Sequence, residues 1–377
     1  MNFEYSDEQQ QLANSLGKLL ANDYSFDKRK LILNSSTGGS DAVWAHFAEM
    51  GLTAVALPET DGGFGGGAVD LMAAMEACGE ALVVEPLLDN LVAARLVSRA
   101  GSAAQRAALL PGLIDGSARL AFAALEPGRR YALAPAKTRA LAVGNGWVLD
   151  GDKCVVVGAP SAHRLLVSAR TGGTADDATR VSLFVVDAKA AGVRLNPHRT
   201  VDGQRAADVH FEGVTLAANA LLGPAGSALP LIDEATDFAT ALLCADAIGA
   251  MKYANDATLE YMKTRKQFGV PIASFQVLQH RMVEMYIVCE QARSMAILAA
   301  SKVDTAGNAA ERQRAVSAAK IKIADAARHV SQESVQLHGG MGMSEELKIS
   351  HTFRRLTMIA QRFGDADHHL ERYAALS

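Results

Sequence analysis

The chain has 377 residues, of which 49% are hydrophobic and 21% charged. This composition is ordinary for a globular protein and excludes a disordered or fibrous chain, and the length suggests two or three domains of roughly 100–200 residues each. The formal net charge is −4. Because no basic excess is available to neutralise a phosphate backbone, nucleic acid is excluded as the main partner.

The cysteine and apolar patterns predict a soluble, cytoplasmic protein. The four cysteines are far apart and form no CxxC pair, so neither a disulfide framework nor a cysteine zinc site is expected. The first residues, MNFEYSDEQQ, do not resemble a signal peptide, and no apolar run approaches the roughly 20 residues that cross a membrane. His368 and His369 are adjacent rather than at metal-ligand spacing, so no metal site is expected.

The first third of the chain is helical in pattern. Ser6 is expected to cap a first helix whose leucines recur at helical spacing. Further helices are predicted over Asp41–Met50, Ala68–Leu82, Leu88–Ala100 and Ala103–Leu110.

A glycine-rich run lies between two of these helices. Gly63, Gly65 and Ala68 imitate the G-x-G-x-x-[GA] fingerprint of dinucleotide-binding folds. That fingerprint requires the glycine turn to leave a strand directly, whereas residues 58–61 separate it from the apolar residues 54–57. A surface loop before a helix is therefore expected.

The pattern changes to short strands near Arg119. Gly144-Asn145-Gly146 is a hairpin signal between two predicted strands, and Asp150-Gly151 is expected to turn the chain again. The predicted strands are Ala140–Val143, Trp147–Asp150, Lys153–Val157, Arg164–Ala169, Val181–Val186 and Ala207–Phe211.

From Pro224 onward the pattern is helical again. Four long helices are predicted, over Leu229–Lys263, Phe275–Thr305, Ala309–His338 and Ser344–Tyr373. The sequence thus predicts an α+β chain with an N-terminal helical domain (1–118), a middle antiparallel β domain (119–223) and a C-terminal four-helix bundle (224–377). The bundle is the expected oligomer interface.

Two strings of the predicted bundle could bind a ligand. Arg265 offers a guanidinium fork for a pyrophosphate, and Gln276 and Gln336 offer amide donors and acceptors. Gly339-Gly340 would let a ligand approach the main chain closely. The alternative interpretation is a helix cap and a solvated turn.

Together the strings RKQFGVPI (265–272) with Phe275-Gln276, and QLHGGMG (336–342), resemble the acyl-CoA dehydrogenase family. Leu57-Pro58-Glu59 and Glu126-Pro127-Gly128 resemble further motifs of that family, and the likeness covers the whole chain. DGGFGGG (61–67) and FGDADHHL (363–370) are most similar to the small subunits of pimeloyl-CoA dehydrogenases within it.

The resemblance implies FAD-dependent α,β-dehydrogenation of an acyl-CoA, in which a carboxylate removes the α proton and the β hydrogen leaves as hydride to the flavin. It also implies electron-transfer flavoprotein as electron acceptor. The residues that would hold the adenosine and pyrophosphate half of a neighbouring subunit's flavin are Arg265, Gln267, Phe268, Gln276, Gln336, Leu337, His338, Gly339 and Gly340.

The chain departs from the family where the reaction takes place. Phe363 occupies the usual position of the glutamate base, and Ala239 occupies the alternative one. Asp246 lies seven residues after Ala239, on the same helical face, and is the nearest substitute carboxylate. Its alternative interpretation is a buried, hydrogen-bonded helix residue.

The flavin-ring segment is altered as well. The family's Thr-Glu-Pro-Gly-x-Gly-Ser-Asp corresponds to residues 125–132, and its Trp-Ile-Thr corresponds to Val155-Val156-Val157. The threonine and serine donors and the indole wall are therefore lost.

Three hypotheses remain open from the sequence. The first is a subunit that works with a larger acyl-CoA dehydrogenase subunit as an α2β2 complex, on a CoA ester that could be dicarboxylic. The second is a self-sufficient homotetramer with an unorthodox base. The third is a non-catalytic protein that keeps the fold and binds flavin or CoA.

Overall fold

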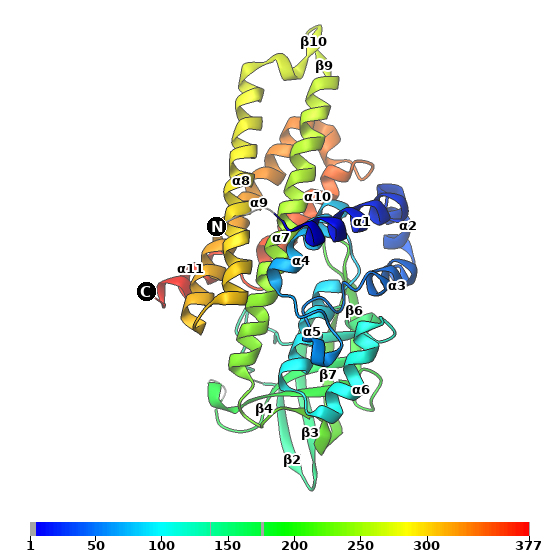
Figure 1. Cartoon of the computed structure of the whole chain (residues 1–377), viewed down its shortest axis with the longest axis vertical. Coiled ribbons are helices and arrows are strands. Elements are labelled where there is room, and N and C mark those ends of the chain that lie inside the picture. The colour runs from blue at the N-terminus through cyan, green and yellow to red at the C-terminus, as the bar shows by residue number, and fades with distance from the viewer. Residues whose placement is uncertain (1–4, 136, 175–176, 377) are drawn as a thin grey trace. The chain divides into compact units, whose positions relative to one another are not determined.

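The computed structural model describes residues 5–135, 137–174 and 177–376. In chain order these residues form helices, then a β-sheet, then long helices (Figure 1). The predicted α+β fold class, with helical N-terminal and C-terminal parts around a middle β part, is confirmed. In the described part of the chain, no helix is long and apolar enough to cross a membrane.

The N-terminal part contains α1 (Asp7–Asp23), α2 (Phe26–Asn34), α3 (Asp41–Glu49), α4 (Ala68–Ala81), α5 (Leu87–Ala100) and α6 (Ala103–Ile114). Ser6 caps α1 as predicted, and Gln9 completes a capping box with it. Helix α2 was not anticipated, because its apolar residues do not follow a helical period. Residues 54–57 lie in turns rather than a strand, so the glycine run follows no strand, as expected.

The middle part contains β1 (Leu120–Ala123), β2 (Arg139–Val143), β3 (Gly146–Val157), β4 (Arg164–Arg170), β5 (Val181–Asp187), β6 (Val193–Arg199), β7 (Arg205–Ala217) and β8 (Leu221–Leu222). In the described residues they form one eight-stranded sheet in the order β6-β7-β3-β2-β4-β5-β8, with β1 beside β4. Most ladders are antiparallel, but β1 and β2 each pair with β4 in parallel. Side chains of these strands, among them Phe184 and Phe211, form a buried apolar cluster.

The predicted turn at Asp150-Gly151 is wrong. Strand β3 runs through it, and the Asp-Gly pair is absorbed by an irregularity in the ladder with β7 between Leu149 and Gly151. Gly151 has φ +135°, which glycine adopts at little cost. The Gly144-Asn145-Gly146 hairpin, by contrast, joins β2 to β3 as predicted.

The C-terminal part contains α7 (Leu229–Thr264), the short hairpin of β9 (Lys266–Gln267) and β10 (Val270–Pro271), α8 (Gln276–Thr305), α9 (Ala309–His338), α10 (Lys348–Gln361) and α11 (Ala366–Ala374). The first three helices match the prediction closely. The fourth predicted helix, Ser344–Tyr373, is wrong in extent, because residues 362–365 break it into α10 and α11. The alanine-rich face of α9 is buried.

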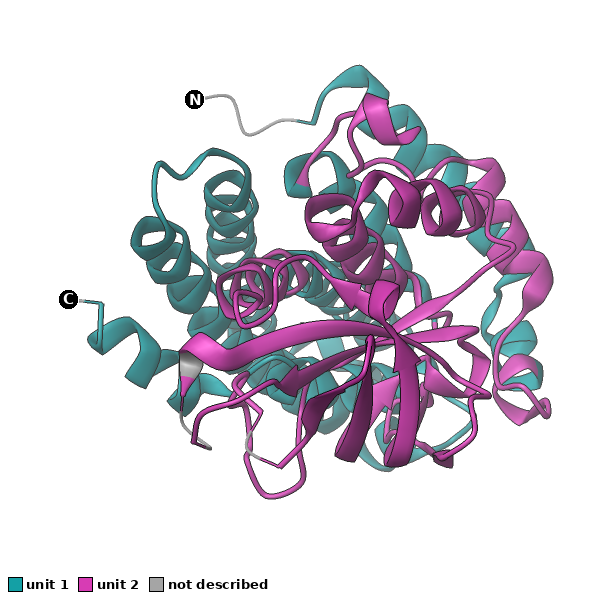
Figure 2. Ribbon diagram, turned by 90° about the horizontal axis from the view of Figure 1, so that it is seen from below, with its two compact units in different colours: residues 1–31, 68–83, 240–377 teal, residues 32–67, 84–239 magenta. Residues whose placement is uncertain are grey.

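The described chain divides into two compact units (Figure 2). One unit comprises residues 1–31, 68–83 and 240–377, and the other comprises residues 32–67 and 84–239. The N-terminal helices are therefore shared out, with α1 and α4 in the first unit and α3, α5 and α6 in the second. The three domain boundaries read from the sequence stay a prediction, since packing groups the chain in another way.

Within the first unit, α4 crosses α7 at a pair of glycines. A Cβ atom at Gly79 would overlap the carbonyl oxygen of Asp246, and one at Gly249 would overlap the carbonyl oxygen of Glu76. Each helix thus packs one glycine directly against the main chain of the other. This crossing is only possible because neither position carries a side chain.

We expect Gly79→Ala to destabilise the protein by about 1–3 kcal/mol, the usual cost of overpacking. The measurement is denaturant unfolding followed by circular dichroism. Gly17→Ala in α1 is the matched control, because nothing lies within 4 Å of a Cβ there, and it should be neutral or slightly stabilising. Equal midpoints for the two variants would contradict the tight crossing.

Candidate functional site

The first candidate string forms an exposed hairpin at the end of α7 (top of Figure 1). Strands β9 and β10 pair in antiparallel register, and the turn residues Phe268 and Gly269 have φ +52° and +83°. Two left-handed residues in succession make the tight turn that suits a two-residue hairpin. The Phe268 ring is 93% exposed, although left-handed geometry is costly for a bulky residue.

The polar side chains of this string are also presented to solvent. Arg265, Gln267 and Gln276 are all exposed. Among the described residues, the Arg265 guanidinium has no hydrogen bond or ion pair. A charged fork with free donors at the end of the bundle is suited to a phosphate group.

The second candidate string ends α9. The buried His338 ring stacks on Tyr261 of α7 with a centroid distance of 4.4 Å, which places this string beside the last turns of α7. His338 Nδ1 donates to the Ser334 carbonyl oxygen at 2.8 Å, and burial lowers the pKa of this histidine. Leu337 is buried as well, so these two side chains anchor the string rather than face a ligand.

Gln336, Gly339 and Gly340 lie on the exposed side of the same string. Gly339 has φ +61°, and a Cβ at either glycine would meet nothing within 4 Å. The main chain is therefore open to close approach by a ligand from outside. The two strings together offer a guanidinium, amides and bare main chain, and this donor set fits a pyrophosphate and an adenosine.

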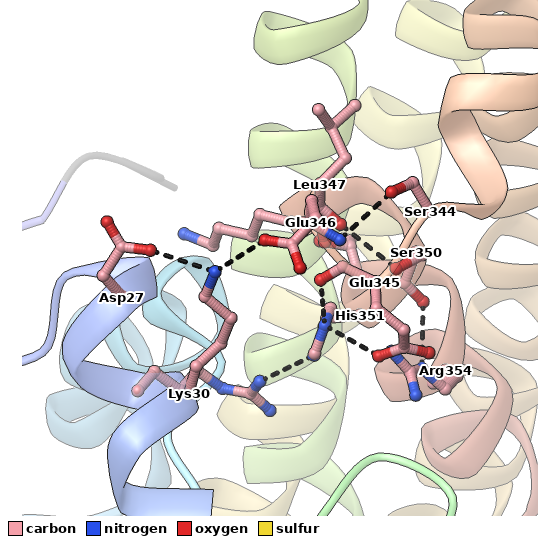
Figure 3. Close-up of polar contacts among 12 residues, drawn as sticks. Asp27, Lys30, Ser344, Glu345, Glu346, Leu347, Ser350, His351 and Arg354 are labelled. Carbon is pink, nitrogen blue, oxygen red and sulfur yellow. Dashed lines mark hydrogen bonds and ion pairs between the residues drawn. The ribbon is translucent and has the colours of Figure 1, made fainter.

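The loop after this string is held by a polar cluster (Figure 3). Lys30 of α2 pairs with Glu346 at 3.0 Å, and Arg29 Nη1 lies 3.0 Å from His351 Nδ1. Because a guanidinium only donates, His351 must accept at Nδ1 and donate from Nε2 to the Glu345 carbonyl oxygen at 3.2 Å. Burial and the charges of Arg354 and Arg29 lower the pKa of His351, so it is neutral here.

In the β part, Glu126 holds together the segment that the sequence resemblance assigns to the flavin ring. Its carboxylate accepts from the main-chain amides of Lys137 and Thr138 at 2.9 and 2.8 Å, and lies 3.5 Å from the Lys153 ammonium. Burial raises the pKa of Glu126, but Lys153 and these hydrogen bonds outweigh it, so the pKa is lowered. A cavity of about 520 Å³ lies beside Pro127 and Lys153.

Val155, which the sequence resemblance places where the family has an indole wall, is strained. It has φ +50°, lies in an irregularity of the β3–β7 ladder, and is 45% exposed. Its amide donates to Asp208 Oδ1 at 2.9 Å. For a β-branched residue this conformation is a genuine outlier, and such outliers gather at functional sites.

The two positions at which the sequence resemblance predicts a catalytic base carry no carboxylate. Phe363 lies in the turn between α10 and α11 with φ +59°, and Arg362 stacks on its ring at 4.8 Å. Ala239 lies fully buried in α7.

Asp246 lies further along α7, and its carboxylate is already engaged. Arg355 of α10 donates to Oδ2 at 2.5 Å and to Oδ1 at 3.1 Å, and both side chains are buried. Proton abstraction by Asp246 would require this ion pair to open. The geometry therefore favours the interpretation of Asp246 as a structural residue, while its catalytic role stays untested.

Three family models match the chain. They are the acyl-CoA dehydrogenase N-terminal domain at residues 6–117, the middle domain at residues 121–214 and the C-terminal domain at residues 229–375. The chain belongs to the acyl-CoA dehydrogenase family.

Individual relatives agree with this. Acyl-CoA dehydrogenase FadE12 of Mycobacterium tuberculosis is 30% identical, over 95% of this chain and 93% of its own. Caffeyl-CoA reductase-Etf complex subunit CarC of Acetobacterium woodii is 28% identical, over 81% and 82%. The solved structure of a Tcur3481-Tcur3483 steroid ACAD variant is 31% identical with a TM-score of 0.87, over 98% and 97%.

The acyl-CoA dehydrogenase family is thus confirmed, and FAD, the cofactor predicted from the sequence, is the cofactor of this family. The finer likeness to pimeloyl-CoA dehydrogenase is not supported by these relatives and stays a proposal. The assignment of individual residues to the cofactor also stays a prediction.

The sequence interpretation did not anticipate that three charged side chains of this chain are buried. Lys153, Lys320 and Arg355 are each almost fully buried. A signal for Lys320 was available, since it shares a helical face with Val316 and Ile323. A lysine is seldom fully buried unless its amine has partners inside the protein.

We expect Asp246→Asn to lower stability by about 3 kcal/mol, because it leaves the Arg355 charge buried without its partner. Chemical denaturation measures this. Asp256→Asn is the control on the same helix, since Asp256 is exposed and pairs with surface Lys252. Full stability of Asp246→Asn together with lost turnover would instead support Asp246 as the base.

Proposed function

We propose that this chain is a subunit of an FAD-dependent acyl-CoA dehydrogenase that works with a larger subunit of the same family. The observation that carries this proposal is a contrast within one molecule. The strings suited to the adenosine and pyrophosphate half of FAD are exposed and open, whereas both base positions hold apolar side chains. Such a chain can complete another subunit's site without a full site of its own.

In this proposal Arg265 binds the pyrophosphate of a flavin held mainly by the larger subunit. Gln267, Gln276 and Gln336 would contact the adenosine half, the Phe268 ring would pack on it, and the open main chain at Gly339 and Gly340 would approach it closely. Leu337 and His338 would fix the string from the buried side. Bound FAD supplies the redox chemistry of the reaction.

The α proton would be removed by a carboxylate of the larger subunit. Phe363 cannot accept a proton, and Ala239 has no polar atom. Asp246 is the remaining candidate in this chain, and its ion pair with Arg355 argues against it. General-base catalysis is commonly worth about 10²–10⁴-fold, so a chain without a base should be nearly inactive alone.

The relatives bear on the electron-transfer partner and on the class of CoA ester. CarC is named as a subunit of a reductase complex with Etf, which supports electron-transfer flavoprotein as the redox partner, and in a dehydrogenation that partner would accept the electrons. The Tcur3481-Tcur3483 protein is named a steroid ACAD, which favours a steroid CoA ester, while the likeness of residues 61–67 and 363–370 favours a dicarboxylyl-CoA such as pimeloyl-CoA. A self-sufficient homotetramer remains the second candidate.

Arg265→Ala should lower the flavin content of the purified complex several-fold, because a charge-assisted contact to the pyrophosphate is lost. The flavin absorbance per chain measures this. Arg328→Ala, at an exposed arginine of α9 that pairs with Asp325, is the control and should retain the flavin. Unchanged occupancy in Arg265→Ala would reject this assignment.

The chain alone should show little or no acyl-CoA dehydrogenation, and activity should appear with the larger subunit. The assay compares the lone chain, the complex, and each with Asp246→Asn, on medium-chain, dicarboxylyl and steroid CoA esters. Robust turnover by the lone chain that carries Asp246→Asn would refute two ideas at once, namely that the chain needs a larger subunit and that Asp246 is the catalytic base.

A further inference from the structure

The turn that carries Phe363 is strained. Phe363 has φ +59° and Gly364 has φ +119°. A left-handed phenylalanine persists only when its surroundings fix it. A Cβ at Gly364 would lie 2.5 Å from His368 Cδ2 and 2.6 Å from His369 Nε2. The two histidine rings therefore pack closely against the turn.

Lys320 holds this turn from α9. The side chain is fully buried, and Nζ donates to the carbonyl oxygens of Gly364 at 2.6 Å and Ala360 at 3.2 Å. Ala360 belongs to the last turn of α10, where carbonyl groups lack helical partners and favour a positive charge. Burial lowers the pKa of Lys320 to about 8, so the amine is mostly charged at neutral pH.

His369 of α11 holds the neighbouring carbonyl. Its Nε2 lies 3.1 Å from the Phe363 carbonyl oxygen, and its Nδ1 lies 3.2 Å from Ser317 Oγ. A carbonyl oxygen only accepts, so Nε2 carries the proton and Nδ1 accepts from the serine. Burial lowers the pKa of His369 to about 3, so this neutral tautomer persists at physiological pH.

We propose that Lys320 and His369 are positioning residues that fix the main chain at Phe363 and Gly364, so that the side chain of residue 363 is presented in one place. Both residues donate hydrogen bonds from buried side chains to main-chain carbonyl oxygens. These hydrogen bonds do not depend on which side chain residue 363 carries. The turn is therefore preorganised although it holds no base. The inference rests on the proposed function only in giving residue 363 a place at the reaction site.

The test uses Lys320→Met, which keeps the length of the side chain and removes its donors. The chain is labelled with fluorinated phenylalanine, and the fluorine NMR signal of Phe363 is assigned by its absence in Phe363→Leu. We expect this signal to broaden or split in Lys320→Met, while the signals of the other phenylalanines stay in place. Amide exchange in residues 361–366 should become about tenfold faster, because a charge-assisted hydrogen bond is lost.

Lys348→Met is the matched control. Lys348 lies over the Tyr253 ring at 3.9 Å, and burial lowers its pKa to about 8 as well, but it is the first residue of α10, whereas the turn follows the last. It should leave the Phe363 signal and the exchange of residues 361–366 unchanged. If Lys320→Met does not fold, His369→Phe removes the other donor and should give the same local effect.

An unchanged Phe363 signal and unchanged local exchange in the variant that folds would overturn the inference. So would an equal change in all phenylalanine signals, since that indicates general loosening. Neither measurement requires flavin or acyl-CoA. Turnover by the lone chain would refute the proposed function, in which a larger subunit supplies the base. It would not affect the NMR and amide-exchange results, so failure of the proposed function can be distinguished from failure of this inference.

Discussion

The buried ion pair between Asp246 and Arg355 sets the geometry of the helical unit. It fixes α10 against α7 through two charge-assisted hydrogen bonds. At the same residue, the Asp246 main chain receives the close approach of α4 at Gly79. A single residue of α7 therefore fixes the position of both α4 and α10 against this helix. Since α10 leads into the turn at residues 362–365, that turn depends on the same contact.

Buried lysines support two of the segments in which the sequence resemblance places reaction residues. Lys153 supports the segment around Glu126, and Lys320 supports the turn around Phe363. Burial of a charged amine is costly unless its hydrogen bonds are satisfied. Here the acceptors belong to the segments around Glu126 and Phe363, so each lysine holds its segment in place through the groups that accept its hydrogen bonds.

Backbone strain shows the same pattern. Among the described residues, the non-glycine positions with positive φ are Leu82, Arg130, Val155, Phe268 and Phe363. All but Leu82 lie in strings that the sequence resemblance matches to motifs of the family. Left-handed non-glycine residues cost about 1–3 kcal/mol each and persist where the surroundings over-determine them. The surroundings of these residues therefore hold their main-chain conformations.

The sequence by itself determined the α+β order, the extents of α7, α8 and α9, and the cap at Ser6, because these depend on local periodicity and capping. The resemblance of two strings was enough to identify the family and its cofactor. Only the tertiary structure decided that Asp246 is paired with Arg355 and that the last predicted helix breaks at Phe363. It also decided that the N-terminal helices divide between two units. These features arise from contacts between residues distant in the chain, such as Asp246 with Arg355 and Lys320 with Gly364, which no local pattern encodes.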